Sequence, residues 1–189
     1  MSAVRERWAA VTNDDARRRF AEVVVPHLDD AYALARWLAG NGADAEDIVQ
    51  DAALRAYRGI SGYVGGNARA WTLTVVRNCA YTWLAKNRPK ALVFTDNIEE
   101  AERVGMAALG PPETATPEAD MIARQDGARL TAAIGELPVP FREVLVLREV
   151  QGLAYREIAE LMNVPIGTVM SRLARARKLL IAALREDDS

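Results

Sequence analysis

The sequence predicts an all-α protein with two small helical domains, and three observations support this. Apolar residues recur at helical spacing without strand-like alternation, and Ala, Leu, Arg and Glu dominate the composition. A length of 189 residues suffices for two small domains. An acidic segment rich in proline and glycine divides the chain. We expect a first domain over 14–88, a flexible linker over 89–122 and a second domain over 123–186, ending in a helix-turn-helix.

Composition and charge limit the classes of function. The net charge is −2, so any affinity for nucleic acid must come from local patches. One cysteine excludes an internal disulfide and suits a reducing cytoplasm, and one histidine without a cysteine cluster cannot form a typical zinc site. No apolar run approaches the ~20 residues of a membrane span, and the start MSAVRERWAAVTNDD lacks a signal-peptide core. We expect a cytoplasmic protein without cofactor or membrane insertion.

The first domain begins with a helical stretch over residues 14–39, which Pro26 interrupts. Because proline removes a helical hydrogen bond, either the helix kinks or two helices meet with Pro26 in the first turn of the second. Asn41 and Gly42 predict a turn, after which Asp44 can cap a helix running through ADAEDIVQDAALRAYRGI. The outward face of that helix is polar, which in most helices means only that it is solvated.

The next segment, GISGYVGGN, predicts a loop that Asn67 closes by capping the following helix. A lone glycine-rich loop is weak support for phosphate binding, and the GxGxxG pattern is absent. The helix from Ala68 to Arg88 interleaves cations and an amide with aromatic side chains. This arrangement suits single-stranded DNA, although buried aromatic residues explain the same pattern. We expect Cys79 to be a small core residue.

Pro89 ends this helix, and the linker that follows is acidic. Residues 89–120 hold seven acidic and two basic side chains. A long segment of this kind marks a boundary between domains. From Ala123 the helical pattern resumes, with apolar positions that predict two scaffold helices: Leu130, Ala133, Ile134 and Leu137 on one, then Phe141, Val144, Leu145 and Leu147 on the other.

Residues 153–180, LAYREIAELMNVPIGTVMSRLARARKLL, predict a helix, a tight turn and a second, basic helix. Asn163 tolerates the left-handed conformation that ends a helix, and Pro165 suits a first helical position. Residues 165–185 contain five basic side chains and no acidic one. A basic amphipathic helix alone is usually just a solvated face, but after a turn of this length it predicts a helix that enters a DNA major groove.

These motifs resemble the extracytoplasmic-function group of bacterial RNA polymerase sigma factors. AEDIVQDA, WTLTVVRN and GTVMSRLARAR occur in the order of that family. The resemblance implies a subunit without intrinsic catalysis that binds core RNA polymerase, reads the −10 and −35 promoter elements and opens DNA. It also implies control by an anti-sigma factor. In that family the linker threads through the polymerase, where acidic groups could imitate nucleic acid; a merely solvated tether is the alternative.

The resemblance assigns three sets of site residues. The implied partner is core RNA polymerase, through its beta and beta-prime subunits. The helix through AEDIVQDA would dock on the clamp helices of the core through Asp47, Gln50, Asp51, Arg55 and Arg58. The glycine-rich loop and next helix read and melt the −10 element through Tyr63, Asn67, Trp71, Arg77, Asn78, Lys86 and Arg88. The helix over 165–180 reads the −35 element through Thr168, Met170, Ser171, Arg172, Ala174, Arg175, Arg177 and Lys178.

Four positions depart from the family pattern. Met170 stands where a basic residue is common, and it cannot donate two hydrogen bonds to guanine. The DNA base preferred at this position should therefore differ from that in the usual promoters of the family. Ala154 replaces a common serine and loses the side-chain cap, at a typical cost of about 1 kcal/mol. Thr82 replaces a usual aspartate and Ala85 a usual arginine.

Two other classes of function compete with this interpretation. A conventional transcriptional regulator would sense a ligand or dimerise through its N-terminal helices and would bind operator DNA without polymerase. Such a protein gives no reason for AEDIVQDA and WTLTVVRN. An enzyme is disfavoured because the sequence contains no metal cluster, activated nucleophile or phosphate loop.

Overall fold

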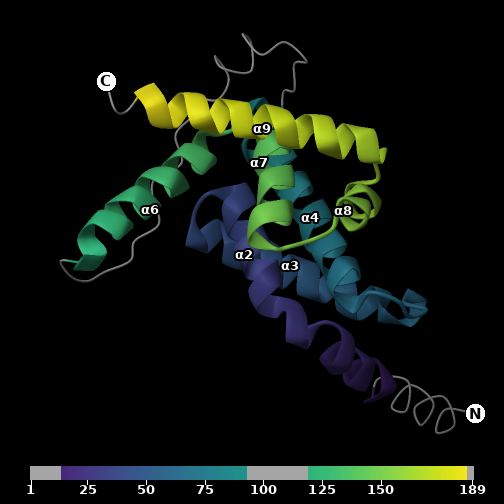
Figure 1. The fold of residues 1–189 in the computed structure, drawn as a ribbon. Coiled ribbons are helices and arrows are strands. Elements are labelled where there is room, and N and C mark those ends of the chain that lie inside the picture. Colours follow the sequence, from purple (N-terminus) through teal and green to yellow (C-terminus); the bar gives the residue numbers. More distant parts are fainter. Residues whose placement is uncertain (1–13, 93–118, 187–189) are drawn as a thin grey trace, which may run out of the picture.

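The computed structural model describes residues 14–92 and 119–186, and side chains are described for 14–92 and 127–185. Every regular element in these two segments is helical (Figure 1). Residues 93–118, most of the predicted linker, lie outside the described residues. None of the described helices is both long and apolar enough to cross a membrane.

The N-terminal half consists of a helix over 14–23 and three longer helices that pack on one another: α2 (Leu28–Ala39), α3 (Gly42–Gly59) and α4 (Ala68–Asn87). Pro26 lies in a 3₁₀ turn, η1 (Val25–His27), so the chain forms two separate helices as the second predicted arrangement had it, but Pro26 precedes α2 instead of lying in its first turn. Two further 3₁₀ turns, η2 (Ile60–Gly62) and η3 (Pro89–Leu92), follow α3 and α4.

Asparagine residues cap two of these helices. The prediction that Asp44 caps α3 was wrong, because the helix begins at Gly42 and the Asn41 side chain accepts the hydrogen bond of the Asp44 backbone N–H at 2.9 Å. Asp44 instead lies in the first turn, where a carboxylate favours the positive end of the helix. The prediction for Asn67 is confirmed, since its side-chain oxygen accepts from Ala70 N at 3.0 Å.

The C-terminal half contains α6 (Ala119–Glu136), α7 (Val139–Leu145), the π-helical turn η4 (Val146–Val150), α8 (Tyr155–Met162) and α9 (Ile166–Glu186). Asn163 ends α8 with φ 53°, as predicted. Pro165 precedes α9 instead of lying in its first position, and its carbonyl accepts from Thr168 N at 2.9 Å. Ala154 N donates to the Glu157 side chain at 2.8 Å, so this hydrogen bond of the capping box forms even though Ala154 has no side-chain oxygen to make the other one.

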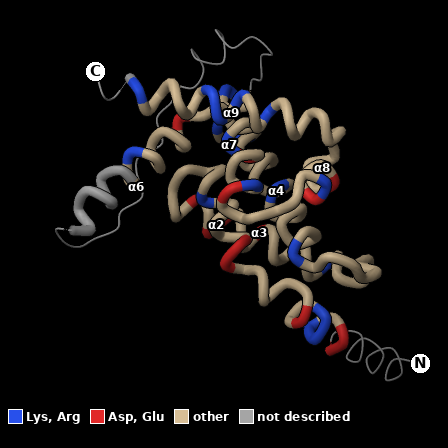
Figure 2. Tube along the Cα trace, in the orientation of Figure 1, with Lys and Arg blue, Asp and Glu red and all other residues tan. Residues whose placement is uncertain are grey.

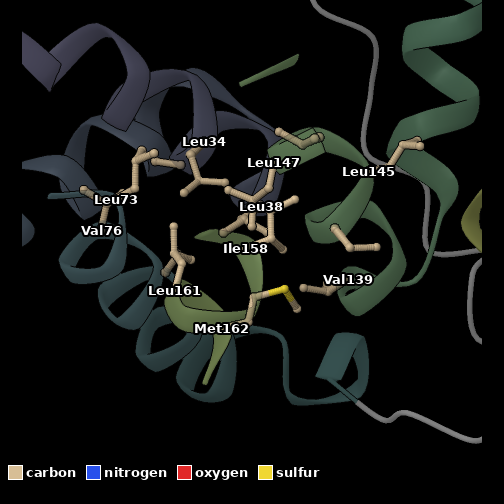
Figure 3. Close-up of a cluster of buried hydrophobic side chains, with 14 of the residues drawn as sticks. Leu34, Leu38, Leu73, Val76, Val139, Leu145, Leu147, Ile158, Leu161 and Met162 are labelled. Atoms are coloured by element: carbon tan, nitrogen blue, oxygen red, sulfur yellow. The ribbon is translucent and has the colours of Figure 1, made fainter. Parts of the chain in front are cut away.

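One apolar core joins the two halves. α2 contacts α7, and α4 contacts α8. Figure 3 shows side chains from both halves meeting in this core: Leu34, Leu38, Leu73 and Val76 from the first, and Val139, Leu145, Leu147, Ile158, Leu161 and Met162 from the second. Burial of this common surface stabilises a closed arrangement of the halves. The basic helix α9 packs across α7 and α8 on the other side of the C-terminal half (Figure 1).

Candidate functional site

The exposed face of α3 carries the residues predicted to bind core polymerase. Ala45, Ile48, Ala52 and Ala56 are buried against the neighbouring helices, which turns Asp47, Gln50, Asp51, Arg55 and Arg58 outward. Arg55 and Asp51 form an exposed ion pair at 2.8 Å, one turn apart. Such an exposed pair adds little stability.

Sequence reasoning missed an apolar side chain in the middle of this face. Leu54 is 56% exposed and lies on the same side of α3 as Asp47, Asp51 and Arg58. The sequence itself places Leu54 on this face, because residues 47, 51, 54 and 58 follow the three- and four-residue spacing of one helical face. The α3 face therefore offers an apolar centre with a charged border, as protein interfaces commonly do.

The loop before α4 brings together the aromatic residues predicted at the −10 element. The rings of Tyr63 and Trp71 lie 5.4 Å apart, and Tyr63 Oη donates to the carbonyl of Gly66 at 2.8 Å. Gly65 and Gly66 both have left-handed φ angles, which few other residues adopt. Val64 at the tip of this loop is 98% exposed. The loop thus presents an apolar tip beside a tilted aromatic pair.

The cations and amides predicted at the −10 element do not form one open surface. Asn78 and Lys86 are exposed on α4. Arg88 is engaged within the N-terminal half: it donates to Ala39 O at 2.9 Å, and its guanidinium stacks over the Trp83 ring at 5.4 Å. Asn67 and Arg77, in contrast, contact the C-terminal half.

Arg77 is held by a buried carboxylate of α7. Its Nε lies 2.5 Å from Glu143 Oε1, and the two side chains are 16% and 0% exposed. Tyr81 Oη donates to the other carboxylate oxygen at 2.6 Å, and the Arg77 guanidinium lies over the Tyr81 ring at 4.3 Å. Sequence reasoning did not predict this cluster.

The charges in this cluster shift its pKa values in opposing ways. Burial alone lowers the pKa of Arg77, but the Glu143 carboxylate outweighs it and leaves the pKa raised. Burial and the same carboxylate raise the pKa of Tyr81 far above its ordinary range, with Arg77 and Arg172 acting against them. Tyr81 therefore remains a neutral hydrogen-bond donor to Glu143.

Further polar contacts cross between the halves. Asn67 Nδ2 donates to Glu157 Oε1 of α8 at 2.9 Å. Arg69 donates to Gln151 Oε1 of the C-terminal half and to the Asp30 carboxylate of its own half, each at 2.6 Å. The Arg142 guanidinium donates to the carbonyls of Trp37 at 3.0 Å and Leu137 at 2.8 Å. Burial, the larger cause, and the charge of Arg88 lower the pKa of Arg142 to about 10.

The residues predicted to read the −35 element lie on α9. Val169, Leu173 and Ala176 are buried, so the opposite side of the helix faces outward. Figure 2 shows where Lys and Arg occur along α9. Met170 is 54% exposed, and Ser171, Ala174, Arg177 and Lys178 are exposed beside it. Thr168, Arg172 and Arg175 are partly buried. Ser171 Oγ donates to Thr168 O at 3.1 Å, and Arg177 pairs with Glu149 at 2.6 Å.

Within the described segments, no group of three or more His, Cys, Asp or Glu side chains could hold a metal ion. Cys79 is a buried free thiol.

Known families match both halves of the chain. Residues 23–90 match Sigma-70 region 2, and residues 127–180 match Sigma-70, region 4. The RNA polymerase sigma-H factor of Pseudomonas aeruginosa is 32% identical over 173 residues, which cover 89% of this chain and 88% of that protein. The ECF RNA polymerase sigma-E factor of Escherichia coli K12 is 34% identical over 139 residues, covering 72% of each chain.

A longer relative and a solved structure add to these matches. The ECF RNA polymerase sigma factor SigE of Mycolicibacterium smegmatis is 34% identical over 165 residues, covering 84% of this chain but 59% of that protein. The sigma factor RpoE of Bartonella quintana, solved in complex with the anti-sigma factor NepR, is 26% identical with a TM-score of 0.65. That alignment covers 88% of this chain and 96% of RpoE.

Proposed function

The chain belongs to the extracytoplasmic-function group of RNA polymerase sigma factors, and we propose that it directs core polymerase to specific promoters as a non-catalytic subunit in the cytoplasm. One observation carries this proposal: a region 2 match and a region 4 match follow one another in the same chain. A conventional regulator needs a helix-turn-helix but has no use for a polymerase-binding region.

In this proposal, α3 is the polymerase-binding element. Asp47, Asp51, Arg55 and Arg58 supply charges of both signs, Gln50 supplies an amide, and Leu54 supplies an apolar anchor between them. Charged and polar groups in such an interface set register and partner choice, whereas the buried apolar centre contributes most of the affinity.

The two DNA elements are read by different surfaces. The loop at Val64 and the Tyr63–Trp71 pair would receive an unpaired base, because extruding a base costs a few kcal/mol that stacking can recover. α9 would lie in the major groove of the −35 element, with Met170, Ser171, Ala174 and Arg175 toward bases and Arg172 and Arg177 near phosphates. The ion pair of Arg177 with Glu149 would exchange for a phosphate contact.

Control by an anti-sigma factor is also part of the proposal. The Bartonella quintana relative was solved with its anti-sigma factor bound, and its alignment spans most of both chains. The described part of this chain exposes the α3 face that such an inhibitor could cover.

Run-off transcription with purified bacterial core polymerase tests the function. We expect initiation at a discrete site only when the protein is present. Asp47→Arg combined with Gln50→Ala should abolish initiation and core binding, whereas Glu46→Arg, an equal charge reversal on a different side of α3, should not. Tight binding to duplex DNA without core polymerase, together with no core binding, would favour the conventional regulator instead.

A further inference from the structure

We propose that Arg19, on the N-terminal helix over 14–23, is a positioning residue for the loop over 63–67 that reads the −10 element. The half-buried Arg19 side chain donates to the backbone carbonyl of Tyr63 at 2.5 Å, across a separation of 44 residues in the sequence. Arg19 would therefore act on DNA through Tyr63. The proposal rests on the proposed function, because it concerns how that loop selects a base.

The hydrogen bonds inside the loop shape its turn but do not orient it on the domain. Tyr63 Oη donates to the carbonyl of Gly66 at 2.8 Å, and Tyr63 N donates to the carbonyl of Ile60 at 3.2 Å. Gly65 and Gly66 both have left-handed φ angles, and glycine loses more conformational freedom on ordering than any other residue. A contact from a distant helix, such as that of Arg19, can hold this loop in one orientation.

A second apolar cluster, distinct from the core between the halves, fixes the N-terminal helix beside the loop. Its buried members are Val24, Ala56 and Ile60. Side chains of the helix and the two aromatic rings of the −10 surface pack against this same cluster: Ala16, Phe20, Val23, Tyr63 and Trp71. The Phe20 ring also meets the Tyr57 ring of α3 edge-on, with centroids 5.7 Å apart. The helix thus gives Arg19 a rigid base.

Holding the Tyr63 backbone also holds its ring, which lies 5.4 Å from that of Trp71. An extruded base recovers the cost of unstacking only where aromatic rings are already placed to receive it. Phosphate contacts carry no sequence information and do not need this arrangement. Loss of the Arg19 contact should therefore weaken discrimination between bases more than it weakens binding of single-stranded DNA in general.

Arg18 provides the matched control, because it lies on the same helix but pairs with Asp15 of that helix in an exposed position. Arg19→Met removes the donors and keeps a long apolar side chain, and Arg18→Met makes the same chemical change one residue away. Two other roles of Arg19 predict different results. A direct phosphate contact would weaken binding of every sequence equally, and a solvated side chain would change nothing.

Fluorine NMR of the full chain labelled with 5-fluorotryptophan reports the loop without DNA. The Trp71 signal is assigned by its loss in Trp71→Phe. Arg19→Met should shift and broaden the Trp71 signal, because the Tyr63 ring beside it is no longer held, and should leave the signals of the other three tryptophans unchanged. Arg18→Met should leave all four signals unchanged.

Binding of single-stranded DNA to the protein in complex with core polymerase gives the second readout. The probes are fluorescent oligonucleotides that carry the −10 element of a promoter active in the run-off assay, and the same strand with each base of the element replaced in turn. Arg19→Met should weaken binding of the native strand roughly tenfold, on the order of the loss of one stacked base. The strand that lacks the extruded base should bind nearly as before, so discrimination at that position falls by the same factor.

The outcomes separate positioning from the other roles. An unchanged Trp71 signal would overturn the proposal, and so would base discrimination equal to that of Arg18→Met. Equal weakening of every strand, with a salt slope reduced by about 0.7, would show a phosphate contact instead. If Arg19→Met does not fold, Phe20→Leu loosens the same helix by removing its ring contact with Tyr57, and both readouts should move in the same direction.

Failure of the unmodified protein to start transcription with core polymerase would count against the proposed function. The Trp71 signal of the free chain would still show whether Arg19 holds the loop, so the two failures are distinguishable.

Discussion

Arg77 and Glu143 form an ion pair between two halves of the chain, 66 residues apart in the sequence. The pair lies at the edge of an apolar core, with Tyr81 bonded to the same carboxylate. Its placement links the surface proposed to melt DNA with the scaffold of the helix-turn-helix.

Glu143→Ala should lower the free energy of unfolding by about 3–5 kcal/mol, because it leaves the Arg77 charge and the Tyr81 hydroxyl without their buried partner. Urea unfolding followed by circular dichroism measures the change. Asp51→Ala, which breaks the exposed pair with Arg55, should cost about 1 kcal/mol or less. Equal urea midpoints for the two variants would contradict this prediction.

Asn163→Ile should destabilise the helix-turn-helix by about 1–3 kcal/mol, because a β-branched residue strains at the φ of 53° that ends α8. Asn163→Gly should leave stability nearly unchanged, since glycine adopts this conformation without strain. Thermal unfolding of the three proteins under identical conditions distinguishes these cases. An isoleucine variant as stable as the glycine variant would show that the turn tolerates another conformation.

Met170→Arg should strengthen binding to duplex −35 DNA and make the binding more sensitive to salt. Met170 is exposed on α9, so an arginine there can contact guanine or phosphate. If it contacts a phosphate, the slope of log affinity against log salt should steepen by about 0.9. Fluorescence anisotropy over a salt series measures both quantities in the polymerase-bound protein, and Met170→Leu is the uncharged control that should change neither.

Cys79 should resist alkylation by iodoacetamide at pH 8 until the protein unfolds. Burial, the larger cause, raises the pKa of its thiol from 9.0 to about 11, so the folded protein favours the neutral form. The corresponding stability is fully present below pH 9 and is lost as the pH rises from 9 to 11. Urea midpoints of the native protein and Cys79→Ala should converge over this range; a constant difference would contradict the shift.

Local chemistry in the sequence was enough to predict the helices and most of their ends. Asn67 and Asn163 each act through hydrogen bonds or backbone angles within a few residues, so their roles can be inferred without the fold. Asp44 and Asn41 show the limit, because both can cap a helix and only the structure fixes its first residue. The roles given to the three sets of site residues stay predictions.

The contacts between the halves could not be predicted in the same way. Arg142 and Glu143 stand side by side in VPFREVL, where two adjacent charges usually indicate a solvated helix face. Both are buried, because α7 is covered on every side by other helices. Arg142 reaches Trp37 and Glu143 reaches Arg77 on distant helices, and no spacing along the chain encodes those two contacts.

Arg142 reaches the carbonyl of Trp37 in the last turn of α2 and the carbonyl of Leu137 just beyond α6. Both groups belong to helix ends that lack helical hydrogen-bond donors. A planar guanidinium can satisfy two such acceptors at once, and its flat fork allows only a narrow range of directions between them. Arg142 therefore constrains the angle between the end of α2 and the end of α6. A lysine, which has a single ammonium group, could not constrain it in this way.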